Sequence, residues 1–180
     1  MNARKAVLTA GCMLAAFLAA CSHVRDSKHV EVAPGTEMGR YQVFGVLPFG
    51  DNGGGKGRAM AQDVGKALKD KGLQVVEMDV MEKEYRKTKG DTFGMTLFGM
   101  NTLRSRTKAE VLVTGSITEK SYSLYVQELE SGDMLIDVKA QRRVGEIPRA
   151  EVLESMMKYL TGEGATTALG APADEPGITP

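Results

Sequence analysis

The feature that most constrains this chain is the basic and apolar pattern at its N-terminus. Arg4 and Lys5 precede Ala6–Ala20, an almost purely apolar run, and the first acidic residue is Asp26. The run has the length of the apolar region of a secretory signal. It is shorter than the roughly twenty apolar residues that a transmembrane helix needs. We therefore expect residues 1–20 to be a signal peptide.

The apolar run ends in Leu18–Cys21, which reads Leu-Ala-Ala-Cys and resembles the bacterial lipobox. The small side chains of Ala19 and Ala20 suit the groove of a signal peptidase, and the thiol of Cys21 is the nucleophile that takes up diacylglycerol. Cys12 is a poorer candidate because it lies within the apolar run. We expect cleavage between Ala20 and Cys21, with lipid on Cys21. The alternative is an ordinary secretory signal beside an incidental cysteine.

This assignment also limits how the exported chain can be stabilised. Cys12 leaves with the signal and Cys21 is acylated, so no thiol remains for a disulfide or a metal site. A chain of about 160 residues can instead bury a single core. Loss of Arg4 and Lys5 reduces the 23 basic residues to 21 against 23 acidic ones, a net charge of −2. That balance lacks the strong positive charge typical of nucleic-acid binding.

Polar segments flank the part of the chain that can form a core. Ser22–Arg40 lacks apolar periodicity, so residues 21–40 are expected to be a lipidated tether. Residues 161–180 are rich in Gly, Ala, Thr and Pro, which predicts a disordered tail. The folded domain is expected over residues 41–160. His23 and His29 both fall in the expected tether, so we expect no histidine-based catalytic or metal site in the domain.

Within the domain, the hydrophobic pattern predicts alternating strands and helices. Strands are expected over Tyr41–Phe49, Leu73–Val80 and Val111–Ile117, and the alternating residues 122–126 and 134–140 are expected to form a hairpin around Ser131-Gly132-Asp133. Helices are expected over Gly57–Lys71, over Asp91–Arg106 with Met95, Phe98 and Leu103 on one side, and after Pro148, while Met81–Lys89 is compatible with a helix. The order β-α-β-α-β-β-β-α predicts an α/β (α+β) fold, in which helices pack on a mixed parallel and antiparallel sheet.

Three segments resemble, in the same order, motifs of a family of envelope lipoprotein domains. Val46–Phe49 with the Gly/Asn-rich turn after it, Ala109–Ile117 and Leu124–Leu135 are similar to the opening strand, the central strand and the hairpin of the CsgG/LpoB/PelC-like family. The N-terminal domain of TolB is a more distant member. The resemblance runs from Tyr41 to the end of the last helix. It implies a non-enzymatic domain that docks on partners or assembles into rings at the outer membrane.

Two patterns suggest ligand chemistry that we do not expect. Gly50–Gly57 nearly matches a phosphate-binding loop, but Gly57 replaces the hydroxyl residue that would hold magnesium. We therefore expect a flexible turn there, with no nucleotide and no cofactor. Met60, Met95 and Met156 are expected to pack in the core rather than to bind a soft metal. Asp63, Asp79 and Glu119 are expected on solvated faces, so no catalytic residue is assigned.

These observations predict a lipoprotein at the periplasmic face of the outer membrane. The residue after Cys21 is Ser22, and the sorting rule that the resemblance implies retains a protein in the inner membrane when Asp stands there. The expected function is that of a non-enzymatic, oligomeric accessory component of an envelope export or assembly machine. Its expected partners are the membrane, through the lipid, and envelope proteins or a second copy of itself.

Two alternatives remain open. One is an LpoB-like regulator that binds a penicillin-binding protein in peptidoglycan synthesis, which would need a longer tether. The other is an enzyme of unknown chemistry. Phe93, Leu97 and Phe98 are candidates for a contact surface, and the alternative for them is that they cover the sheet.

Overall fold

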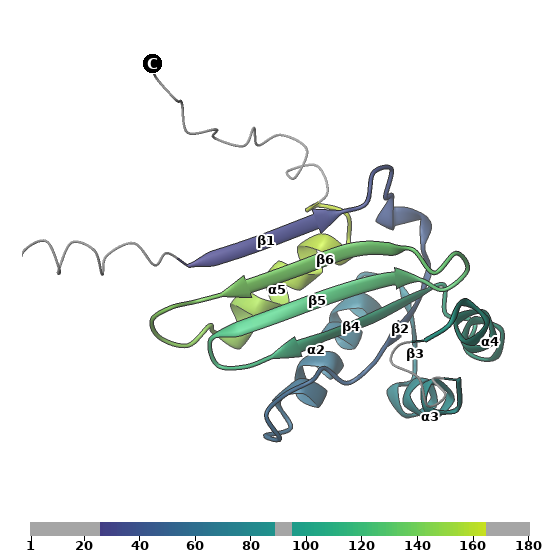
Figure 1. Ribbon diagram of the computed structural model, residues 1–180, viewed down its shortest axis with the longest axis horizontal. Coiled ribbons are helices and arrows are strands. Elements are labelled where there is room, and N and C mark those ends of the chain that lie inside the picture. The colour runs from purple at the N-terminus through teal and green to yellow at the C-terminus, as the bar shows by residue number, and fades with distance from the viewer. Residues whose placement is uncertain (1–25, 89–94, 165–180) are drawn as a thin grey trace, which may run out of the picture.

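A computed structural model of the protein describes residues 26–88 and 95–164. In these residues one mixed sheet has the strand order β1-β6-β5-β4-β2-β3 (Figure 1). β2 pairs in parallel with β3 and β4, and the other pairs are antiparallel. The strands are β1 Ser27–Val32, β2 Val43–Val46, β3 Gln74–Val76, β4 Val111–Ile117, β5 Ser121–Glu128 and β6 Met134–Gln141. The predicted mixed α/β sheet and its hairpin are confirmed.

Helices cover the sheet from both sides. α2 (Lys56–Asp70) and α5 (Arg149–Leu160) lie behind it in Figure 1, whereas α3 (Met78–Thr88) and α4 (Leu97–Thr107) lie near its β2–β3 end. β4 shows the two sides in its alternating side chains. Val111 and Val113 belong to the main core beneath α2 and α5, and Leu112 belongs to a second core beneath α3 and α4.

In the main core, one face of α2 and one face of α5 pack on the sheet. In α2, Met60, Val64 and Leu68 recur at helical spacing and are fully buried. Met156 of α5 is equally buried. The expectation that Met60 and Met156 pack in the core is therefore confirmed.

Packing in the second core differs from two expectations, one about a strand and one about a helix. The strand expected over Leu73–Val80 ends at Val76, and α3 begins at Met78. The physical reason is that Met81 and Tyr85, one helical turn apart, both pack into the second core. Leu103 of α4 belongs to this core and Met95, just before the helix, packs against it, but Phe98 does not contribute because its side chain points to solvent.

The expected tether contains the first strand of the sheet. β1 pairs with β6 along its full length, from Ser27 opposite Gln141 to Val32 opposite Ile136. Val30 and Val32 pack against the main core, and Met38 in the short 3-10 helix Met38–Arg40 is buried. The expectation of a tether is therefore wrong for residues 27–40. Two apolar side chains among polar neighbours are enough for an edge strand with one buried face.

The segment after β1 is also held to the far end of the hairpin. Glu128 of β5 accepts hydrogen bonds from Tyr41 Oη at 2.8 Å and from Ser131 Oγ at 2.6 Å. Arg40 Nη2 lies 2.8 Å from the same carboxylate. These contacts lower the pKa of Glu128, the hydrogen bond from Ser131 contributing most. Residues 38–41 are thus part of the folded unit.

Candidate interaction surfaces

The loop that resembles a phosphate-binding loop carries its own anion. Asp51 Oδ2 accepts the Gly57 N–H at 2.7 Å, and Asp51 Oδ1 accepts the Gly53 N–H at 2.8 Å. The bond from Gly57, followed by that from Gly53, lowers the pKa of Asp51, so the carboxylate is negatively charged at the start of α2. A bound phosphate would need this same helix N-terminus. The arrangement therefore favours a structural turn over a nucleotide site.

Gly57 has a steric role in the same loop. A Cβ atom at this position would lie 1.9 Å from the carbonyl oxygen of Phe49. The Phe49 N–H donates to the Gly57 carbonyl at 3.3 Å. The backbone after β2 and the first turn of α2 are therefore in direct contact. The hydroxyl residue of a phosphate-binding loop does not fit here. The sequence motif draws attention to Gly57 but not to Asp51, whose signal is an acidic residue just before a helix start.

The acidic residues considered for catalysis lie in exposed ion pairs. Asp63 pairs with Arg149, Asp79 with Arg58, and Glu119 with Lys56. In the part of the chain that the structure describes, no group of three His, Cys, Asp or Glu side chains is placed to hold a metal ion. His29 lies in β1, with its Nε2 atom 3.9 Å from Glu31.

The face of the sheet opposite α5 presents polar side chains of β1, β4, β5 and β6. A groove of about 380 Å³ there is lined in part by Ser116, Ser123, Tyr125 and Lys139. The two serine hydroxyls lie 2.8 Å apart, and the ammonium of Lys139 lies over the ring of Tyr125 and 2.8 Å from Asp137. These polar groups are bonded mainly to one another. The groove thus has the character of a solvated sheet face.

An exposed apolar patch lies around the start of α4. We define the apolar patch as Leu97, Phe98 and Met134, whose exposed fractions are 52, 83 and 46 per cent. Leu97 reaches the β5–β6 turn, since a Cβ atom on Gly132 would lie 3.3 Å from its Cδ1 atom. The alternative that Leu97 and Phe98 cover the sheet is therefore not what the structure shows. Phe93 lies outside the described residues.

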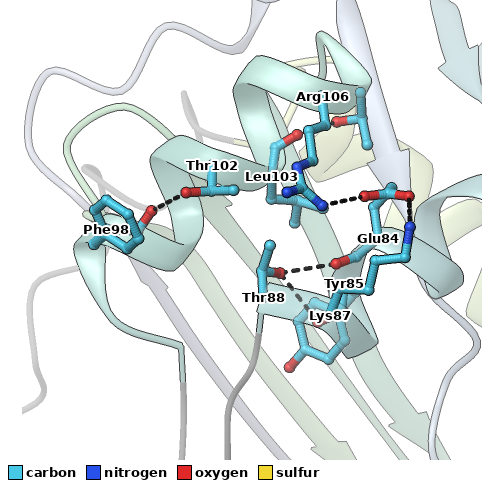
Figure 2. A network of polar contacts seen from close by, with 9 residues as sticks. Glu84, Tyr85, Lys87, Thr88, Phe98, Thr102, Leu103 and Arg106 are labelled. Carbon is cyan, nitrogen blue, oxygen red and sulfur yellow. Dashed lines mark hydrogen bonds and ion pairs between the residues drawn. The ribbon is translucent and has the colours of Figure 1, made fainter.

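Polar contacts hold α4 against α3 and so fix the position of the apolar patch (Figure 2). Glu84 of α3 lies 2.6 Å from Lys87 Nζ and 2.9 Å from Arg106 Nη1 of α4. The hydrogen bond from Lys87, followed by that from Arg106, lowers the pKa of Glu84. Figure 2 shows the Phe98 ring at the far end of α4, away from this network. Phe98 is thus exposed on a helix that is packed in place.

The expected lipidation site, Cys21, lies outside the described residues, as does the expected cleavage position after Ala20. The structure does place Asp26, at the start of β1. Five residues of fully extended chain span at most about 18 Å. The backbone at Asp26 can therefore lie no farther than this from Cys21, compared with about 65 Å for the full tether expected from the sequence. No helix in residues 26–88 or 95–164 is long and apolar enough to cross a membrane.

No protein family matches the sequence, and no curated protein matches it. Several solved structures are similar in fold. A PelC dodecamer from Paraburkholderia phytofirmans is 10% identical with a TM-score of 0.43, and the match covers 75% of this chain and 94% of that one. Lipoprotein GNA1162 from Neisseria meningitidis is 17% identical with a TM-score of 0.44, covering 70% and 98%. The C-terminal domain of LpoB from Escherichia coli is 12% identical with a TM-score of 0.41, covering 57% and 83%. These similarities concern the fold alone.

The loop before α2 generates a first prediction. Gly57→Ser completes the sequence pattern of a phosphate-binding loop, but the new side chain must displace the Phe49 carbonyl. We expect a loss of about 1–3 kcal/mol in the free energy of unfolding, as for other overpacked sites, and no binding of magnesium-ATP by calorimetry.

The matched control is Gly54→Ser, where the nearest atom to a new Cβ is Lys56 Cγ at 3.9 Å. We expect its stability to stay within about 0.5 kcal/mol of the wild type. A Gly57→Ser protein that keeps full stability and binds magnesium-ATP would contradict this account of the loop.

Proposed function

We propose that the protein is a lipoprotein of the periplasmic face of the outer membrane, anchored through acylated Cys21, and that it serves as a non-enzymatic accessory component of an envelope export or assembly machine. The observation that carries this proposal is the short distance between the expected lipid site and the first strand. At most about 18 Å of chain separates Cys21 from Asp26, so the domain works next to the membrane. Ser22 after the lipidated cysteine supports the outer membrane as its location.

The same distance weighs against the alternative of an LpoB-like regulator. Such a regulator must reach a penicillin-binding protein across the peptidoglycan layer, and a chain of five residues cannot supply that reach. A non-enzymatic role is supported by the two groups of polar residues described above. Asp51 in the loop before α2 binds backbone N–H groups, and Lys139 and Asp137 on the sheet face bind each other.

The apolar patch supports a role in protein contacts. Phe98 is 83 per cent exposed although the helix that carries it is packed against α3. Exposed aromatic side chains are enriched where proteins meet. A second copy of the chain or another envelope protein would cover the patch in this proposal.

The anchor can be tested by changing its two key residues. We expect Cys21→Ala to leave the domain folded and to release it from the membrane fraction, because the thiol that carries the lipid is lost. Ser22→Asp should keep the lipid but move the protein to the inner membrane. Fractionation of the two membranes, with mass spectrometry of the N-terminus, measures both outcomes. A Cys21→Ala protein that stays in the outer membrane would contradict the proposal.

Self-association can be tested on residues 22–180 without lipid by analytical ultracentrifugation. If a second copy covers the apolar patch, the wild type sediments as an oligomer and Phe98→Glu as a monomer, because burial of the new carboxylate is unfavourable. Val144→Glu is a matched control at another exposed apolar residue, 78 per cent accessible, and should behave as the wild type. A wild type that remains monomeric at high concentration rules out the self-associating form of the proposal.

A further inference from the structure

The start of β1 is tied to the loop between β6 and α5. Asp26 Oδ1 accepts the backbone N–H of Arg143 at 3.0 Å, and Asp26 Oδ2 lies 3.9 Å from Arg142 Nε. Arg142 also binds Glu151 of α5 at 2.8 Å. Among the described residues, the one closest in sequence to the expected lipid site is thus fixed to the domain.

Two loops form one surface around this point. The Arg142 N–H donates to the Lys120 carbonyl at 2.7 Å, and the Ile147 N–H donates to the Glu119 carbonyl at 2.8 Å. These bonds join the β4–β5 turn to the β6–α5 loop beside the start of β1. We call this surface the anchor end and define it as residues 26, 118–120 and 142–147. In Figure 1 it is the left end of the sheet, where β1 begins and β6 ends.

The anchor end carries an exposed apolar side chain among charged residues. Val144 at the loop is 78 per cent exposed, and Arg142 and Arg143 precede it directly. Lys120 on the adjoining turn is also exposed. Apolar side chains enter the boundary between headgroups and acyl chains, and basic residues next to a membrane are attracted to anionic lipids. Val144 supplies the apolar side chain. The basic residues Lys120, Arg142 and Arg143 are matched in number by Asp26, Glu119 and Glu146 at the same end. Val144, and not net charge, is therefore the feature of this end that suits a lipid surface.

We propose that the anchor end rests on the membrane, with Val144 inserted among the headgroups. This inference rests on the lipidation of Cys21 proposed above, because a chain of at most about 18 Å brings this end close to the bilayer. The β1–β6 ladder then stands away from the membrane. Since a six-residue strand spans about 20 Å, the apolar patch beyond its far end faces the periplasm, where a protein partner can reach it.

The test uses the mature lipidated protein in vesicles of phosphatidylethanolamine and phosphatidylglycerol. Val144→Cys introduces a free thiol into a chain whose only other mature cysteine carries the lipid, so one fluorescent label can be attached. Phe98→Cys provides the matched control in the apolar patch. Spin-labelled phospholipid quenches fluorescence only at short range. We expect the label at residue 144 to lose most of its fluorescence and the label at residue 98 to keep it.

Mass spectrometry of each sample separates failure of the inference from failure of the anchor. If the N-terminus is acylated and residue 144 is not quenched, or residues 144 and 98 are quenched alike, the proposed orientation is overturned. If no acyl chain is found, both the anchor and the orientation fail. A label at residue 144 that is already shielded by protein in the absence of vesicles would assign the anchor end to a second copy and would also overturn the inference.

Discussion

The antiparallel pairing of β1 with β6 is the contact on which the position and orientation of the domain depend. It places six residues that follow closely on Cys21 into the sheet, and it buries part of Val30 and Val32 against the main core. The bond from the Arg143 N–H to Asp26 then closes the start of the strand against the β6–α5 loop. Without this pairing, the domain would hang on a flexible segment of about twenty residues. With it, the expected lipid site and the folded domain are neighbours.

The pairing of β1 with β6 also sets which surface features lie near the expected lipid site and which lie far from it. One end of the sheet combines the start of β1 with exposed Val144 and charged residues of both signs, and the region of α4 presents Phe98 and Leu97. Between them, polar residues such as Lys139 and Asp137 are bonded to each other. Asp51 similarly occupies the start of α2, where a phosphate would have to bind.

Much of this fold follows from the sequence pattern, and the exceptions have physical reasons. The run Val111–Ile117 and the alternating hairpin residues predict central strands because their side chains are buried on one or both faces. The hydrophobic pattern does not predict β1, because the single buried face of this strand contributes only two valines among charged neighbours. The spacing of apolar residues groups Phe98 with Met95 and Leu103, but Met100 and Leu103 form the buried side of α4, which depends on where the helix begins. Asp51 was not recognised because its role depends on a turn that brings it back onto the Gly57 N–H.

Amide hydrogen exchange of the mature protein tests the central claim, that β1 is part of the fold, most directly. We predict that the amides of β1 that face β6 exchange at rates set by opening of the sheet, comparable with the amides shared by β5 and β6. The result that would contradict this account is exchange of residues 27–32 at the rate of an unstructured chain while β5 and β6 stay protected. The domain would then be free to move far from its anchor, and the orientation derived from the short connection would not hold.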